Sequence, residues 1–168
     1  LKEAVAPGIT TKDLDRMAAE LTSKRGAQPA FLGYPSSSKS VPAFPGVICA
    51  SKNEAIVHGI PDDVPLKEGD IISIDFGCVY DGFYGDSAIT VPVGKISERA
   101  TLLLEQTQLA LKDAIAQCFP GNRIGDISHA VQSRVEPHGF GIVREFVGHG
   151  IGRNMHEPPQ VPNFGKPL

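Results

Sequence analysis

The segment 71–93, IISIDFGCVYDGFYGDSAITVPV, is the stretch of the sequence that decides the fold. It contains two runs rich in β-branched and aromatic residues, separated by the dipeptide Asp81-Gly82, which strongly favours a two-residue hairpin turn. Such a turn pairs Tyr80 with Phe83, so the numbers of paired residues sum to 163. The sequence therefore predicts a long antiparallel hairpin with a defined register.

The predicted register puts two carboxylates on one face of the hairpin. Asp75 pairs with Ala88 and Asp86 with Gly77, and side chains alternate between the two faces of a strand. The two aspartates are then diagonal neighbours, about 7–8 Å apart at their Cα atoms. Because two unpaired carboxylates repel each other, we interpret the pair as a site for one or two cations. The alternatives are a solvated face, or a slipped turn that separates the aspartates.

The opposite face of the same hairpin is expected to belong to the core. It carries six apolar side chains, namely Ile72, Ile74, Phe76, Phe83, Ile89 and Val91. The carboxylate face carries smaller and more polar residues, namely Ser73, Gly77, Tyr84, Ala88 and Thr90.

Signals for helices and further strands lie on both sides of the hairpin. Thr10 or Thr11 is expected to cap a helix that ends at Gly26. Periodic apolar residues predict two more helices, and short apolar runs predict further strands. The helices are expected at about 97–118 and 125–136, and the strands within 47–58 and at 141–147.

A short motif recurs in the chain at an offset of 113 residues. Pro7-Gly8 is followed by Asp13-Leu14, and Pro120-Gly121 is followed by Asp126-Ile127. Chance recurrence in a helix-rich chain is the alternative, but we favour a duplicated α+β unit. Residues 1–168 would then form a single domain, with a first half over about 1–96 and a second half from about 97.

The duplication also sets an expectation for the two ends of the chain. The counterpart of the 71–93 hairpin would fall at about 184–206, beyond Leu168. The first residue is leucine rather than an initiator methionine. We therefore expect a chain that is truncated at both ends, with its second half cut short.

Composition and charge exclude several classes of protein. The formal net charge of −3 comes from 16 basic and 19 acidic side chains without a long basic run, which argues against nucleic acid or a membrane surface as a partner. No apolar stretch approaches the roughly 18 residues of a membrane-spanning helix. Cys49, Cys78 and Cys118 form neither a disulfide framework nor a CxxC site, so a reducing, cytoplasmic setting is expected.

Three histidines are further candidates for the site. His149 and His156 lie in the segment GHGIGRNMHEP (148–158), whose glycines allow a close approach of the backbone to a ligand. Their spacing matches no standard zinc motif, so loop histidines without a function are the alternative. His58 follows a predicted strand and precedes a turn, where a surface histidine is an equally good interpretation.

Taken together, these segments resemble the type I methionine aminopeptidase family. The motifs that match in order and spacing are Asn53-Glu54-x3-His58-Gly59-Ile60-Pro61, Asp75-x10-Asp86 and Gly148-His149-Gly150-Ile151-Gly152-x3-His156-Glu157-x-Pro159. They extend through nearly the whole chain. The resemblance implies the α+β pita-bread fold, in which two pseudo-symmetric halves surround an antiparallel sheet with helices on the outside.

The resemblance also implies a set of metal ligands. Asp75, Asp86 and His149 would hold metal, and Asp86 would bridge two divalent ions, for which Co, Mn, Fe or Zn are candidates. Two further glutamate ligands of the family are expected after residue 168. The 168-residue chain alone would therefore bind metal weakly and is expected to be inactive without them.

Substrate contacts follow from the same resemblance. His156 would donate a hydrogen bond to the substrate carbonyl, and His58 would contact the substrate near the scissile nitrogen. The pocket for the methionine side chain would be lined by Tyr34, Phe44, Cys49 and Met155, the last at a position where the family often has an aromatic residue. Compared with many members of that family, residues 35–43 are expected to form a longer loop.

The implied activity is removal of the N-terminal methionine from newly made proteins by two-metal hydrolysis of the first peptide bond. The enzyme would be a cytoplasmic monomer with the ribosome as a candidate place of encounter, and neither nucleic acid nor a membrane would be a direct partner. The alternatives are a peptidase related to Xaa-Pro aminopeptidase or prolidase, which usually carries an extra N-terminal domain, and a non-catalytic binding protein with the pita-bread fold.

Overall fold

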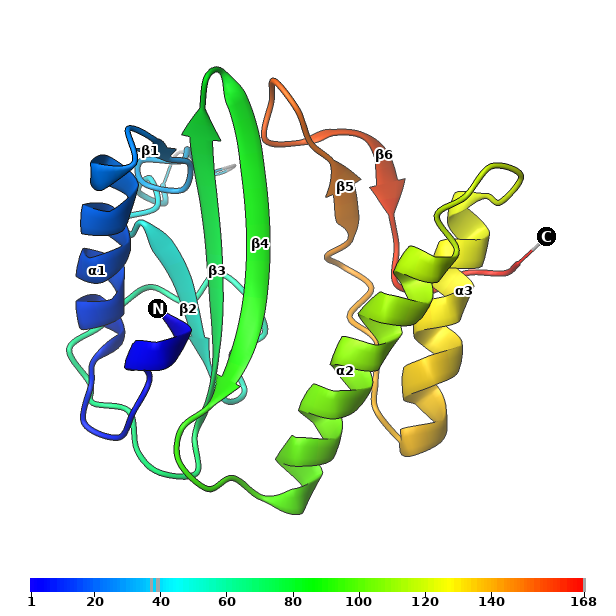
Figure 1. Ribbon diagram of the computed structural model, residues 1–168, viewed down its shortest axis with the longest axis horizontal. Coiled ribbons are helices and arrows are strands. Elements are labelled where there is room, and N and C mark those ends of the chain that lie inside the picture. Colours follow the sequence, from blue (N-terminus) through cyan, green and yellow to red (C-terminus); the bar gives the residue numbers. More distant parts are fainter. Residues whose placement is uncertain (37, 39, 168) are drawn as a thin grey trace. The chain divides into compact units, whose positions relative to one another are not determined.

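The predicted hairpin is the central feature of the structure. In the computed structural model, which describes residues 1–36, 38 and 40–167, β3 (Ile71–Tyr80) and β4 (Phe83–Pro92) pair along their whole length (Figure 1). Asp81 and Gly82 have φ angles of 50° and 77°, as a two-residue turn with two left-handed residues requires. The predicted register is confirmed, because every pair from Ile71–Pro92 to Tyr80–Phe83 sums to 163.

The hairpin belongs to the first of two units, which comprises Leu1–Ser97 and Ile151–Met155. All strand pairings in it are antiparallel. Since β4 occupies one edge of β3, both β2 (Ile48–Lys52) and the short β1 (Gln28–Pro29) pair along its other edge. The result is a four-stranded sheet with β3 at its centre.

Helix α1 (Thr11–Lys24) packs on this sheet and closes the core of the unit. Thr10 is the N-cap, as predicted, and it forms a reciprocal capping box with Asp13. Oδ1 of Asp15 accepts hydrogen bonds from the backbone N–H groups of Val47 (2.6 Å) and Ile48 (2.9 Å), which ties the helix to the start of β2. A 3-10 turn, η1 (Lys2–Ala4), precedes the helix.

The core face of the hairpin is only partly as predicted. Ile72, Ile74 and Val91 are buried against Leu14 and Ala18 of α1 and against residues of β2. Phe83 and Ile89 are 49% and 45% exposed, so their assignment to the core was wrong. Both lie on the edge strand β4, at positions that no other segment buries, whereas Val91 near the end of the same strand reaches the core.

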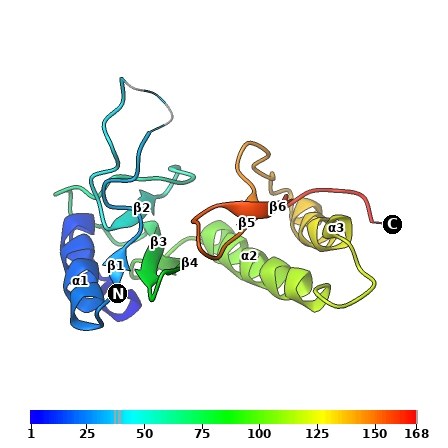
Figure 2. The same ribbon diagram turned by 90° about the horizontal axis from the view of Figure 1, so that it is seen from above.

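The second unit comprises Glu98–Gly150 and His156–Leu168. Its helices α2 (Glu98–Ala116) and α3 (Ile124–Val135) lie side by side (Figure 2) and agree with the two predicted helices. Arg134 of α3 forms an ion pair with Asp113 of α2 at 2.7 Å. A 3-10 turn, η2 (Glu136–His138), follows α3.

A two-stranded antiparallel ribbon completes the second unit. It pairs β5 (Gly148–Gly150) with β6 (Glu157–Val161). The strand predicted at 141–147 is wrong, because this segment is irregular and the ribbon starts only at Gly148. In the irregular segment the Arg144 guanidinium stacks on the ring of Phe164, 4.3 Å from its centroid, and such a tertiary contact overrides strand propensity.

The architecture is α+β, as predicted, with helices and antiparallel strands in the described residues. The division between the two units falls between Ser97 and Glu98, while the sequence duplication itself stays a prediction. Within the described part of the chain, no helix has the length and apolar character needed to cross a membrane.

Candidate functional site

Two carboxylates lie on one face of the β3–β4 hairpin. Asp75 pairs with Ala88 and Asp86 pairs with Gly77, so the two aspartates are diagonal neighbours on adjacent strands. On the same face, the hydroxyl groups of Ser73 and Thr90 form a cross-strand hydrogen bond of 2.8 Å. The alternation of side chains along the strands thus gives one polar face that carries both predicted metal ligands of the first unit.

The electrostatic effect of this pair is visible at Cys49, which is the backbone partner of Asp75 in β2. Burial, together with the nearby carboxylates of Asp75 and Asp86, raises the pKa of Cys49 to about 12. The thiol is therefore neutral at physiological pH, and the negative potential of two carboxylates extends to it. Such a potential fits a cation better than an anion.

An apolar cluster lies next to the carboxylates, within the first unit. Cys49 and Met155 are buried in it, 5% and 7% exposed, and Phe44 packs against it. Three of the four predicted pocket residues are therefore together. Tyr34 has a 40% exposed side chain outside this cluster, and its backbone carbonyl accepts a hydrogen bond from the Phe44 N–H at 2.9 Å.

The sequence analysis missed Phe31, a further buried member of the same cluster. The signal that could have revealed it is Gly77 in the middle of β3, because glycine inside a strand often marks a close approach. A Cβ at Gly77 would lie 2.6 Å from Cε1 of Phe31, so the aromatic ring occupies the space left by the missing side chain.

His58 lies in a segment that is tied to the strand β2. The carbonyl of Gly59 accepts a hydrogen bond from the Ala50 N–H at 2.8 Å, and the Gly59 N–H donates to Oγ of Ser51 at 3.1 Å. His58 itself has a left-handed backbone with φ of 59°. A Cβ at Gly59 would collide with the Ala50 carbonyl, so this close tie requires glycine. The backbone that carries the imidazole is thus fixed.

The other two predicted histidines lie together in the second unit. His149 is on β5 and His156 directly precedes β6, and their ring centroids are 4.3 Å apart. Nδ1 of His149 is 2.9 Å from the Gly150 carbonyl. A carbonyl can only accept, so Nδ1 is the donor in this hydrogen bond. This is the hydrogen-bonding arrangement that holds metal-ligating histidines in proteins.

The donors present fit a divalent cation in their chemistry. They are paired carboxylates in the first unit and the imidazole of His149 in the second, and mixed oxygen and nitrogen donors suit several first-row ions. Over residues 1–36, 38 and 40–167, no three His, Cys, Asp or Glu side chains gather at one point.

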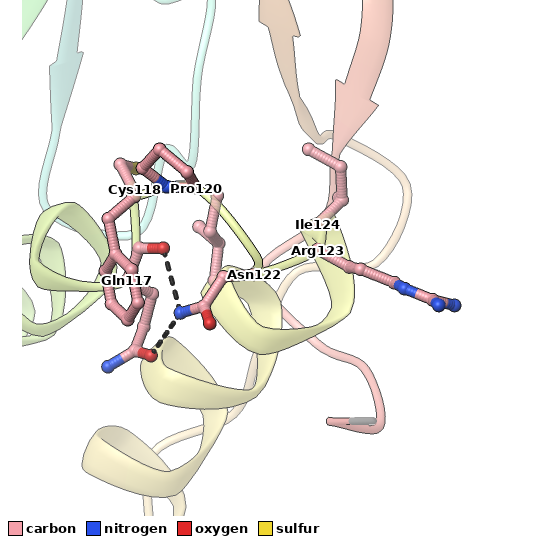
Figure 3. Close-up of a pocket in the computed structure, with 8 residues that line it drawn as sticks. Gln117, Cys118, Pro120, Asn122, Arg123 and Ile124 are labelled. Atoms are coloured by element: carbon pink, nitrogen blue, oxygen red, sulfur yellow. Dashed lines mark hydrogen bonds between the residues drawn. The ribbon is translucent and has the colours of Figure 1, made fainter.

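A separate surface pocket of about 590 Å³ lies at the turn between α2 and α3 (Figure 3). The Asn122 amide donates hydrogen bonds to the backbone carbonyl and Oε1 of Gln117, at 3.1 and 3.0 Å, and so closes the turn. None of the predicted site residues lines this pocket. Its lining consists of Gln117, Cys118, Phe119, Pro120, Asn122, Arg123, Ile124 and Ile127.

Comparison with known proteins identifies the relatives of this chain. A model of metallopeptidase family M24 matches residues 1–168. The chain is 48% identical over 167 residues to methionine aminopeptidase 1 of Bacillus subtilis, covering 99% of this chain and 64% of the relative. It therefore spans 64% of the length of that relative.

Solved structures of methionine aminopeptidases are also similar to this chain. The methionine aminopeptidase of Thermotoga maritima superimposes with a TM-score of 0.92 at 42% identity, covering 99% of this chain and 64% of that one. The prolidase of Pyrococcus furiosus superimposes with a TM-score of 0.79 at 21% identity, covering 99% and 46%, which shows a shared fold only. The predicted pita-bread fold is confirmed.

Proposed function

The chain belongs to metallopeptidase family M24, and from this premise we propose that the protein removes the N-terminal methionine of newly made polypeptides by hydrolysing the first peptide bond. The observation that carries the proposal is the position of the Cys49–Met155 cluster beside two carboxylates on one hairpin face. An apolar, sulfur-containing surface suits a methionine side chain, and a carboxylate pair suits the metal of a metallopeptidase. The 48% identity to methionine aminopeptidases supports it.

We assign the metal ligands to Asp75, Asp86 and His149, together with the two glutamates that the family resemblance implies. The family requires divalent metal; we propose two ions, and Co, Mn, Fe and Zn are all compatible with these donors. When bound, such ions lower the pKa of water toward neutrality and polarise a carbonyl. The Gly150 carbonyl contributes by accepting a hydrogen bond from Nδ1 of His149, which orients the ring.

The other two candidate histidines, His156 and His58, act on the substrate in this proposal. His156 donates a hydrogen bond to the oxygen of the scissile carbonyl, where negative charge develops during attack. His58 contacts the substrate near the scissile nitrogen, and the two hydrogen bonds of Gly59 to β2 keep its backbone in place. Both roles need a fixed imidazole, since a preorganised donor has no reorganisation cost during the reaction.

The substrate side chain would enter against Phe44, Cys49 and Met155. A methionine thioether makes favourable contacts with aromatic rings and packs well in an irregular apolar space. The neutral Cys49 thiol adds no charge to this surface. A charged substrate side chain would lose its hydration here without gaining a partner. This loss disfavours its binding by about 2 kcal/mol or more. Tyr34, with its exposed side chain, would lie at the rim.

We place the reaction in the cytoplasm, on the N-terminal peptides of nascent chains near the ribosome, and we propose a monomer. The three cysteines are free thiols, which suits a reducing compartment. Neither nucleic acid nor a membrane is a direct partner in this proposal.

One assay tests the proposal against its alternatives. The full-length protein is incubated with Mn(II) or Co(II) and then with Met-Ala-Ser or with Xaa-Pro peptides. Release of free methionine supports the proposal. Cleavage only before proline would assign the chain to the Xaa-Pro peptidases, and binding of metal without any cleavage would indicate a non-catalytic binding protein.

A further inference from the structure

The segment Ile151–Met155 is attached to the tip of the β3–β4 hairpin at two points within the first unit. The Tyr84 N–H donates a hydrogen bond of 2.8 Å to the carbonyl of Gly152. One residue further on, the Arg153 guanidinium stacks on the ring of Phe83, with Cζ 4.6 Å from the ring centroid. Two consecutive residues of β4 therefore bind two consecutive residues of the segment.

Met155 is the one buried residue of this segment. Ile151, Arg153 and Asn154 are exposed, whereas Met155 is 7% exposed within the Phe31–Cys49 cluster. The Gly152 N–H donates to the Asn154 carbonyl at 3.2 Å, which folds the segment into a tight turn before Met155. Met155 is thus the buried apolar contact of this segment, and the two attachments to the hairpin directly precede it in the chain.

We propose that Arg153 is a positioning residue that holds Met155 in the wall of the substrate side-chain pocket by stacking on Phe83. Arginine suits this role because its planar guanidinium stacks on aromatic rings. Tyr84 supports the same arrangement, since its backbone binds Gly152 while its side chain packs against the cluster that contains Met155. The use of the pocket for substrate rests on the proposed function, but the attachment of Met155 does not.

The size of the effect follows from the exposure of the contact. Phe83 is 49% exposed and Arg153 is exposed, and cation–π contacts at exposed sites are worth about 0.5–1 kcal/mol. This corresponds to roughly a two- to five-fold change in the equilibrium between seated and released Met155. A released Met155 is open to solvent and to chemical oxidation.

Oxidation of Met155 measures this equilibrium without any enzyme assay. The full-length protein is treated with dilute hydrogen peroxide, and sulfoxide formation is followed by mass spectrometry at Met155 and at Met17, the internal reference in α1. We expect Arg153→Ala and Phe83→Ala each to raise the Met155 rate about two- to five-fold without changing the Met17 rate. The double variant should be no faster than the faster single variant, because both remove one shared contact.

Two further variants separate the contact from general loosening of the chain. Phe83→Tyr keeps an aromatic face and should restore the slow oxidation of Met155. Arg144→Ala removes a comparable stack of arginine on Phe164 elsewhere in the chain and should leave the Met155 rate unchanged. An unchanged Met155 rate in Arg153→Ala, or an equal increase in Arg144→Ala, would overturn the proposal.

Kinetics then tests the link to the pocket. Arg153→Ala should raise the KM for Met-Ala-Ser by up to about fivefold and leave kcat nearly unchanged. A fall in kcat at constant KM would overturn the positioning role. If Met155 becomes faster to oxidise but the wild-type enzyme releases no methionine from any peptide, the attachment stands and the proposed function fails.

Discussion

Two β-ribbons carry the proposed metal ligands, and they are built in opposite ways. The β3–β4 hairpin has ten residues in each strand and one unbroken register around a two-residue turn. The β5–β6 ribbon has strands of three and five residues, with a shift of register between His149 and Gly150. In the hairpin, the face on which a side chain lies follows from its number of residues from the turn. In the ribbon, it depends on local backbone contacts.

The glycines of the β5–β6 ribbon show what those contacts are. A Cβ at Gly148 would lie 3.0 Å from the Val161 carbonyl oxygen, and a Cβ at Gly150 would collide with the Pro158 carbonyl. Backbones that approach this closely leave no space for side chains between them. On the hairpin, a Cβ at Gly85 would meet open space, so glycine is not needed there. The ligands of the two ribbons are therefore sensitive to different substitutions.

The largest effect is expected from removing a carboxylate of the hairpin. Asp75→Asn and Asp86→Asn each take away an anionic donor while keeping the shape of the side chain. Because bound metal supplies several kcal/mol of transition-state stabilisation, kcat/KM should fall by about 10² to 10⁴. Isothermal titration with Mn(II) should show weaker binding in both variants.

The control for this experiment is Ser87→Asn, which adds the same amide one residue away on the other face of β4. It should bind Mn(II) and cleave substrate as the wild type does. If Ser87→Asn and Asp86→Asn lose metal equally, the alternation of faces does not define the site.

Cysteine reactivity measures the combined effect of burial and of the carboxylate pair on Cys49. With the pKa of Cys49 raised to about 12, its thiolate is scarce at pH 8, and alkylation should be on the order of a thousandfold slower than for free cysteine. The pKa is raised, so the rate should keep increasing with pH up to about 12. Iodoacetamide labelling of the metal-free protein, read by mass spectrometry, gives this rate, with the exposed Cys118 as the internal reference.

The same labelling in Asp75→Asn tests the cause of the shift. Loss of one carboxylate should lower the pKa of Cys49 and increase its rate of alkylation. Because burial is the larger cause of the raised pKa, the rate should still stay below that of a free cysteine. Equal labelling of Cys49 and Cys118 in the wild type would contradict both the burial and the field.

Glycine substitutions compare the two ribbons under the same change. Gly150→Ala puts a Cβ against backbone that cannot move independently, so the β5–β6 ribbon should open. Gly77→Ala meets the edge of the Phe31 ring instead, and overpacking of this kind costs about 1–3 kcal/mol. Urea unfolding of both variants measures the loss of stability, and the NMR signals of the His149 ring report on the ribbon.

Gly85→Ala is the matched control on the hairpin, because its Cβ would have nothing within 4 Å. Its free energy of unfolding should lie within about 0.5 kcal/mol of the wild-type value. A loss in Gly85→Ala as large as that in Gly150→Ala would mean that the two ribbons do not differ in their need for glycine.

The regular hairpin could be predicted from sequence because its determinants are local. Asp81-Gly82 specifies the turn, the turn specifies the register, and the register specifies that Asp75 and Asp86 share a face. The same reasoning failed for Phe83 and Ile89, which alternate correctly but lie at the outer edge of the sheet. The alternation of side chains determines on which face of a strand a residue lies, whereas the burial of that residue depends on whether another segment covers it.

The irregular segments could not be predicted for the same reason. Residues 141–147 are rich in apolar side chains, yet Arg144 stacks on Phe164 and no strand forms. The contact of Arg153 with Phe83 joins residues 70 positions apart, and no local pattern in either segment predicts it. The roles of His149 and His156 came from the family resemblance and not from a local pattern in the sequence.

The smallest effect is expected from a polar pair on the carboxylate face itself. Ser73 and Thr90 share a hydrogen bond of 2.8 Å across the hairpin, and cross-strand pairs of this type contribute about 0.2–1 kcal/mol. Ser73→Ala, Thr90→Val and the double variant form a thermodynamic cycle whose coupling energy, measured by urea unfolding, should fall in this range. Mn(II) affinity should stay unchanged, because the register depends on the backbone ladder and the turn. A weakened Mn(II) site in Ser73→Ala would show instead that side-chain pairs, and not residue parity alone, hold the two aspartates in position.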